Sequence, residues 1–326
     1  MIKKDWLRQA QPLLIRIGIL LFLCISISLV SDKFFQMANL INVLRQISTV
    51  TIAACGYTMI LICGGFDLSM GSVLAFSGVT AAVLSSKGYP IGTSLVFGII
   101  MGGIIGLING IGAVIFRIMP FLVTLCTMFI ARGLAWVFSG GQAVVVGLPD
   151  GFTYIGRGFW CFLPISIIIM GICIIVFHII LTKTVLGKHI YAIGGNLETS
   201  YFSGIATRKI PLLLYIVGGI TSGLAGVILA SRLAAGDPNT GTGFEFDVII
   251  ATSIGGTPFT GGEGSVIGTL IGSLIMGVIG NGLNLMGVHA FYQYIIKGVI
   301  LFIVVALDMA VRRGTFKALL GKSSTF

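Results

Sequence analysis

Long apolar runs follow one another along the whole chain, with short polar stretches between them. A helix needs about 20 mostly apolar residues to cross the hydrocarbon core of a bilayer. The runs near or above this length are 12–31, 40–63, 67–86, 91–116, 119–138, 161–182, 210–231, 264–287 and 291–311. A further run, 247–257, is apolar but short, and is either a half-helix or a tenth span. The pattern predicts an all-α polytopic membrane protein with about ten transmembrane segments, some short or discontinuous.

The basic residues between the runs indicate the orientation, because Lys and Arg collect in cytoplasmic loops. Four of them stand at or near the N-terminus: Lys3, Lys4, Arg8 and Arg16. With ten crossings, the loop 183–209 and the basic tail after Asp308 fall on the same side. Both termini are therefore predicted to be cytoplasmic. The loop 139–160 is predicted to be external, and the whole chain, 1–326, is predicted to be one transmembrane domain.

Composition supports the membrane assignment and removes other classes. Hydrophobic residues make up 56% of the chain and charged residues 9%, whereas soluble domains carry about 25% charged residues. The net charge of +10 is spread over short clusters, which does not favour a nucleic acid partner. None of the six cysteines forms a CxxC pair, so neither a disulfide framework nor a zinc site is predicted. The apolar run 13–30 is too long for a signal peptide and lacks a cleavage site, so it is predicted to be a retained span.

Two glycine-rich breaks interrupt the apolar pattern. The stretch "GGFDLSMGSVLAFSG" at 64–78 resembles "GGTPFTGGEGSVIGTLIG" at 255–272, which suggests an internal repeat. Gly64, Gly65, Gly255 and Gly256 are predicted to end one helix and let the chain turn before the next. Interrupted segments at matching positions are typical of transporter pathways. Asp67 is interpreted as the cap of the helix that follows; the alternative is a carboxylate that relays protons.

Polar residues within predicted spans are candidates for a translocation pathway, because such residues usually face the bundle interior or a water-filled cavity. Asn109, Asn281 and Asn284 suit a polar, uncharged substrate. Asn281 and Asn284 are three residues apart and share a helix face. Hydrogen bonding between helices is the alternative role. Glycines that recur every four residues, at 98–110 and at 264–272, predict closely packed helices.

Enzyme motifs are missing from the sequence. There is no HExxH, the three histidines are far apart, and "GKSS" at 321–324 lacks the upstream glycine of a phosphate-binding loop, because Phe316 stands there. The chain is predicted to hold no cofactor and no metal, and not to hydrolyse ATP itself.

Four stretches together resemble the membrane subunits of bacterial ABC importers for monosaccharides, the ribose/xylose/arabinose/galactose/allose permease family. They are "GGFDLSMGS" (64–72), "GKHIYAIGGNLETSYFSGI" (187–205), "GTGFEFDVIIATSIGGTPFTGGEGSVIGTLIG" (241–272) and "NGLNLMGVHAFYQYIIKGVILFIVVALD" (281–308). The likeness extends over essentially the whole chain. It implies a subunit of the bacterial inner membrane that passes a pentose or aldohexose.

The resemblance also implies partners. These are a second permease copy or a close relative, a cytoplasmic ABC ATPase and a periplasmic sugar-binding protein, within the membrane lipid. The loop 183–209 would then be the segment that couples to the ATPase, rather than a solvated connector. The residues to which the resemblance assigns this role are Gly194, Gly195, Asn196, Glu198, Ser203 and Gly204. The sequence departs from the family at Thr199, Tyr201 and Phe202, which leaves the contacting side chains open.

Three alternatives remain at this stage. An ion-coupled secondary sugar or solute transporter would need a buried carboxylate relay, and apart from Asp67 and Asp308 the acidic residues are predicted to lie in loops or at their edges. A membrane enzyme would need a catalytic constellation, which the sequence does not show. A channel would transport without an ATPase.

Overall fold

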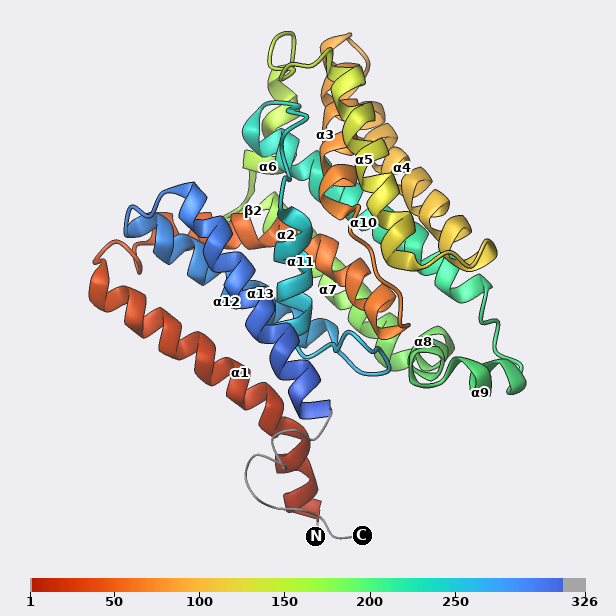
Figure 1. Cartoon of the computed structure of the whole chain (residues 1–326). Helices are drawn as coiled ribbons and strands as arrows, with labels where there is room; N and C mark the ends of the chain where they lie inside the picture. The colour runs from red at the N-terminus through yellow and green to blue at the C-terminus, as the bar shows by residue number, and fades with distance from the viewer. Residues whose placement is uncertain (1, 313–326) are drawn as a thin grey trace.

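Helix α2, Met37–Ile62, lies at the centre of the molecule (Figure 1). Every residue of its second half, from Thr51 to Ile62, is buried. This half is built from small and apolar side chains, so neighbouring helices can pack around its whole circumference. The computed structural model describes residues 2–312; the remainder of the basic tail and the "GKSS" stretch lie outside the described residues.

The described chain is almost entirely helical. The helices around α2 are α1 (Ile2–Val30), α3 (Met70–Ser86), α4 (Ile91–Gly110) with the π-helical turn η1 (Ile111–Ile115), α5 (Pro120–Ser139), α7 (Ile165–Lys183), α10 (Lys209–Leu233), α11 (Phe244–Ile254), α12 (Val266–Leu285) and α13 (Ala290–Arg312). The connections contain the 3-10 turn η2 (Asp150–Thr153), α6 (Tyr154–Arg157), α8 (Val185–Gly195), α9 (Leu197–Phe202) and the antiparallel pair β1 (Phe159–Trp160) and β2 (Leu163–Pro164).

The helices form two groups on either side of α2 and α7 (Figure 1). One group contains α3, α4, α5 and α10, and α10 packs against α2, α3 and α4. The other contains α1, α11, α12 and α13, in which α12 packs against both α1 and α2. The connecting helices α8 and α9 lie at one edge, beyond the end of α7 (Figure 1).

Seven described helices are long and apolar enough to cross a membrane: α1, α4 with η1, α5, α7, α10, α12 and α13. Helix α3 is apolar but shorter, with 17 residues. Helix α11 has 11 residues, and at 1.5 Å per residue it spans about half of the hydrocarbon core. The helix of the short run 247–257 is therefore shorter than a full crossing. The polytopic all-α fold is confirmed, whereas the count of ten crossings and the side of each terminus stay predictions.

The predicted loops contain structure that the apolar pattern did not indicate. The stretch 139–160 contains η2 and α6 and reaches into a small hairpin. The stretch 183–209 contains α8 and α9. Gly194 and Gly195 are the last two residues of α8.

The glycines at 98–110 bring α4 into backbone contact with α10, which confirms the packing predicted for this stripe. A Cβ atom on Gly102 would overlap the carbonyl oxygen of Gly219 and lie 3.0 Å from the Cα atom of Gly223. One on Gly106 would overlap the carbonyl oxygen of Tyr215. The two helices can approach this closely only because both present small residues to each other.

We expect Gly102→Ala to destabilise the protein by about 1–3 kcal/mol, because the added methyl group meets backbone atoms that cannot move independently. The matched control is Gly133→Ala in α5, where a Cβ atom meets nothing within 4 Å. The control should be neutral or slightly stabilising, since alanine is the better helix former. Thermal unfolding of the purified protein in detergent measures both. Equal melting temperatures for the two variants would contradict the close packing of α4 on α10.

Candidate functional site

Helix α9 is a short, exposed helix of 6 residues, and local hydrogen bonds stabilise both of its ends. Its N-cap is Asn196, whose side-chain oxygen accepts a hydrogen bond from the Thr199 N–H at 2.8 Å. The chain leaves α9 through Ser203, whose hydroxyl donates to the Thr199 carbonyl at 2.8 Å, and through Gly204 at φ +77°. A positive φ suits glycine, which has no side chain to clash. Three of the predicted coupling residues thus shape α9.

The outer surface of α9 is apolar. Leu197 is 58% exposed, Tyr201 66% and Phe202 78%. The rings of Tyr201 and Phe202 contact each other edge-on, with centroids 5.7 Å apart. Glu198 is also exposed, and among the described residues it forms no ion pair. An exposed apolar patch with a free carboxylate on a connecting segment is typical of a protein-docking surface.

The end of α8 packs against both glycine breaks, in a contact that we call the glycine junction: Ile62, Gly194, Gly195 and Gly262. The Gly262 N–H donates to the Ile62 carbonyl at 2.8 Å. A Cβ atom on Gly194 would overlap that same carbonyl oxygen and lie 2.7 Å from the Gly262 nitrogen. Nearby, the Tyr191 hydroxyl of α8 donates to the Gly264 carbonyl at 2.8 Å. The connecting segment is therefore in direct contact with the end of α2 and with the loop between α11 and α12.

Both predicted breaks lie where helices end. Helix α2 ends at Ile62, and Gly64 follows with φ +82°. Helix α11 ends at Ile254, Gly255 is its C-cap residue, and Gly256 has φ +88°. A Cβ atom on Gly65 would lie 2.9 Å from the hydroxyl oxygen of Tyr215. Glycine therefore provides both the turn and the close approach at these positions.

Asp67 is not the cap of α3 that the sequence predicted, but lies two residues before the N-cap residue. Helix α3 begins at Met70 with Ser69 as its N-cap residue, and one carboxylate oxygen of Asp67 accepts the Ser69 N–H at 2.7 Å and the Ser69 hydroxyl at 2.6 Å. This bond from residue i+2 closes an Asx turn before the helix. The Asp67 side chain does not reach the N–H groups of α3 itself. Asp67 therefore has a structural role, but it stabilises the turn before α3 rather than the terminus of the helix.

Asn109 joins this turn to two helices from a fully buried position in α4. Its side-chain nitrogen donates to the Ser69 hydroxyl at 2.8 Å and, over a longer 3.5 Å, to the second Asp67 oxygen. Its side-chain oxygen accepts the hydroxyl of Thr127 in α5. In this conformation the amide serves as an interhelical hydrogen-bonding group, the alternative weighed from the sequence. Contact with a substrate at Asn109 stays a prediction.

Asn281 and Asn284 have different partners, although they lie on one face of α12. Asn281 forms a reciprocal pair of amide hydrogen bonds with Asn39 of α2, at 2.8 and 3.0 Å. Asn284 is exposed and accepts a hydrogen bond from Gln293 of α13 at 2.8 Å. Of the three predicted pathway amides, Asn284 is the one that the molecule presents at its surface.

We expect Asn109→Leu to lower stability by about 1–3 kcal/mol, because it leaves buried hydroxyl and carboxylate groups without their partner. The matched control is Asn42→Leu in α2, an exposed asparagine whose side chain makes no hydrogen bond among the described residues. Thermal unfolding in detergent compares the two. If the two variants unfold at the same temperature, the Asn109 network contributes nothing to the fold.

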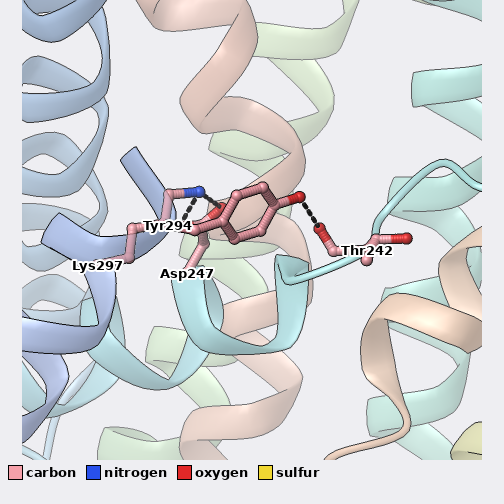
Figure 2. A network of polar contacts seen from close by, with 4 residues as sticks. All are labelled: Thr242, Asp247, Tyr294 and Lys297. Atoms are coloured by element: carbon pink, nitrogen blue, oxygen red, sulfur yellow. Dashed lines mark hydrogen bonds and ion pairs between the residues drawn. The ribbon is translucent and has the colours of Figure 1, made fainter. Parts of the chain in front are cut away.

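One ion pair at the membrane helices was missed from the sequence. Lys297 of α13 binds Asp247 of α11 at 2.8 Å, and beside it the Tyr294 hydroxyl donates to the Thr242 carbonyl at 3.3 Å (Figure 2). Helix α11 starts at Phe244, so Asp247 lies in its first turn rather than in a loop. A lysine inside an apolar run is the signal that an acidic partner was needed. The pair fastens α11 to α13.

The described residues contain no cluster of metal-binding side chains. No group of three or more His, Cys, Asp or Glu side chains among them is arranged to hold a metal ion. What residues 2–312 do provide is a membrane-crossing helical body, two glycine breaks and an exposed connecting segment in contact with both. These features define a polytopic integral membrane protein with interrupted helices of the kind found in transporter pathways.

Comparison with known proteins identifies the class more closely. The chain belongs to the family described as "Branched-chain amino acid transport system / permease component", whose model matches residues 39–305. It is 38% identical over 290 residues to the ribose import permease protein RbsC of Bacillus subtilis, covering 89% of this chain and 90% of that one. No solved structure matches the chain significantly.

Other relatives carry different substrate names. The chain is 37% identical over 308 residues to the ribose import permease protein RbsC of Escherichia coli K12, covering 94% of this chain and 95% of the relative. It is 34% identical over 287 residues to the D-allose transport system permease protein AlsC of the same organism, covering 88% of each. Family membership and the apolar helices together make the chain a multi-pass permease of the bacterial inner membrane.

Proposed function

We propose that the chain is the permease subunit of an ATP-driven, binding-protein-dependent importer for a monosaccharide, a pentose or an aldohexose such as ribose or allose. The observation that carries this proposal is the sequence identity of 34–38% to permeases named for ribose import and D-allose transport, over nearly their whole length. A neutral polar sugar needs hydrogen-bonding groups along its path rather than charges, which agrees with the amide side chains of α12 and α13. Only the family description names amino acid transport, whereas the relatives reported above are named for sugars.

The proposed topology has ten crossings with both termini cytoplasmic, in one permease domain of 1–326. The beginning of α1, the end of α13 and the connecting helices α8 and α9 all lie in the lower part of Figure 1, which supports placing them on one side. Helix α11 and the short α3 would be the discontinuous crossings. The stretch 139–160 would face outside, where a periplasmic binding protein delivers the sugar.

A second permease copy would complete the pathway. Asn42 and Gln46 lie one turn apart in α2, both are exposed, and neither side chain has a hydrogen-bonding partner among the described residues. Exposed amides in a membrane helix are costly against lipid and usually face a partner or water. Together with Asn284 of α12, the helix that pairs with α2 through Asn39, they suit an interface that lines a sugar path. Asn109 and Asn281 would support that path from behind.

A cytoplasmic ABC ATPase would dock on α9 and the end of α8. The exposed patch of Leu197, Tyr201 and Phe202 supports this, as does the contact of Gly194 and Gly195 with both breaks. ATP would be hydrolysed by that partner, so the permease itself needs no cofactor. The ion-coupled transporter is not favoured, because the relatives are import permeases and Asp67 is engaged by Ser69 and Asn109.

Uptake of labelled ribose and allose by cells that express the complete system tests the proposal. An uncoupler that collapses the proton gradient while ATP is held constant should leave uptake unchanged, and depletion of ATP should stop it. Co-purification of an ATPase with the tagged chain is the second measurement. Uptake that fails with the uncoupler at constant ATP would instead establish an ion-coupled transporter.

A further inference from the structure

We propose that the cleft beside α9 binds an anionic phospholipid, with its headgroup on basic side chains and its acyl chains along an apolar wall. The cleft has a volume of about 1390 Å³ and lies between α9, the turn η1 with the start of α5, and the start of α10. Leu197, Tyr201 and Phe202 of α9 also line the cleft, so it borders the surface proposed for the ATPase, whereas the three predicted pathway amides do not line it.

The charge around the cleft is strongly one-sided. Its lining contains three cations, Arg117, Arg208 and Lys209, and one carboxylate, Glu198, which gives a net charge of +2. All three cations are exposed, and the described residues give none of them an ion-pair partner. Unpaired arginines that converge on one hollow suit a phosphate group, to which their planar donors bind in pairs.

The remaining wall is apolar and exposed. Ile118 is 45% and Met119 66% exposed on one side of the cleft, and Leu197 of α9 faces them from the other. A free phosphate or a soluble anion would leave these side chains in water. A phospholipid covers them with its acyl chains while its headgroup meets the cations, so the combination favours an amphiphile.

The position of the cleft agrees with a lipid. Three membrane-crossing helices end at its rim: the span Ile91–Ile115, and the first residues of Pro120–Ser139 and Lys209–Leu233. Helix ends of this kind lie at the level of the headgroups. Basic pockets between membrane helices on the cytoplasmic side are established sites for anionic lipid headgroups. The placement on that side rests on the topology proposed above, but the cleft and its charge do not.

The test uses the permease complex, purified and placed in nanodiscs of phosphatidylcholine with a minor fraction of phosphatidylglycerol. Native mass spectrometry then measures how much phosphatidylglycerol stays bound to the released protein. Both leaflets of a nanodisc have the same composition, so the result does not depend on the orientation of the chain. Retention of the anionic lipid over the zwitterionic one is expected for the unmodified chain.

The paired substitutions Arg208→Gln and Lys209→Gln should lower the affinity for phosphatidylglycerol about thirtyfold, because two basic residues near a headgroup each contribute about fivefold. The matched control is Lys183→Gln with Lys188→Gln, two exposed lysines of the same segment that do not line the cleft. A second variant, Ala206→Trp, keeps the charge and fills the cleft from an exposed position. It should reduce lipid retention as well.

If the control pair loses as much bound phosphatidylglycerol as the cleft pair, general surface charge explains the binding and the proposal is overturned. Unchanged lipid retention in both cleft variants would overturn it as well. The ATPase that co-purifies is recorded in the same spectra. Loss of the ATPase from the cleft variants with lipid retention unchanged would assign the cleft to the ATPase instead. Failure of the unmodified chain to bind any ATPase would contradict the proposed function and leave the lipid result standing on its own.

Discussion

Glu198→Arg is expected to lower sugar import at least about a hundredfold while the chain still inserts into the membrane. Glu198 is exposed on α9, and no described residue forms an ion pair with it. Substitutions at such positions usually change stability by less than about 0.5 kcal/mol. Reversal of a charge at a docking surface costs several kcal/mol of binding energy, because it places like charges together. The loss should therefore arise in docking.

Uptake of labelled sugar, membrane content of the chain and co-purification of the ATPase measure this effect. Glu198→Gln removes the charge without reversing it, and should give an intermediate loss. Asp150→Arg makes the same reversal in η2, directly before α6, which lies in the upper part of Figure 1 away from α9, and should leave ATPase binding intact. Wild-type import by the Glu198→Arg variant would remove α9 from the coupling role.

The helix breaks were predictable because their signal is local. Adjacent glycines at 64–65 and 255–256 stand between apolar runs, and glycine next to such a run marks a helix end. The contact between the two breaks was not predictable, because the bond from Gly262 to Ile62 joins residues 200 positions apart. The similarity of the two stretches suggested equivalent roles but carried no information on whether they touch.

The partners of the polar side chains within the membrane helices could not be predicted from the sequence either. The sequence shows that Asn109 and Lys297 need hydrogen-bonding or charged partners within the membrane, but many polar residues are available to each. The structure selects Ser69 and Asp67 for the first and Asp247 for the second. Helix α8 was missed for a different reason: its two terminal glycines gave it the appearance of a loop, although they belong to a helix whose end is tightly packed.

We expect Gly194→Ala to lower both stability and sugar import, because the end of α8 is tightly packed. The new methyl group would overlap the Ile62 carbonyl oxygen, which already accepts the Gly262 N–H at 2.8 Å. Neither backbone atom can move without displacing a glycine break. We expect a loss of about 1–3 kcal/mol in stability, the usual cost of overpacking, together with loss of import, since the displaced contact joins α8 to both glycine breaks.

The neighbouring glycine provides the control. Gly195 is also helical, and a Cβ atom there meets nothing within 4 Å. Gly195→Ala should therefore be neutral, or stabilising by about 0.5–1 kcal/mol. Thermal unfolding and sugar uptake compare the two variants. Equal melting temperatures and equal import would contradict the close contact of α8 with the end of α2.

The combination of readouts separates two roles for the glycine junction. Because the exposed face of α9 lies outside the overlap, a Gly194→Ala chain that still folds should bind the ATPase normally. Import that fails while the ATPase stays bound would mean that docking and transport are joined through the contact of Gly194 with Ile62. If import decreases only as much as the amount of folded protein decreases, the junction stabilises the fold. The ATPase would then act on the interrupted helices by another route.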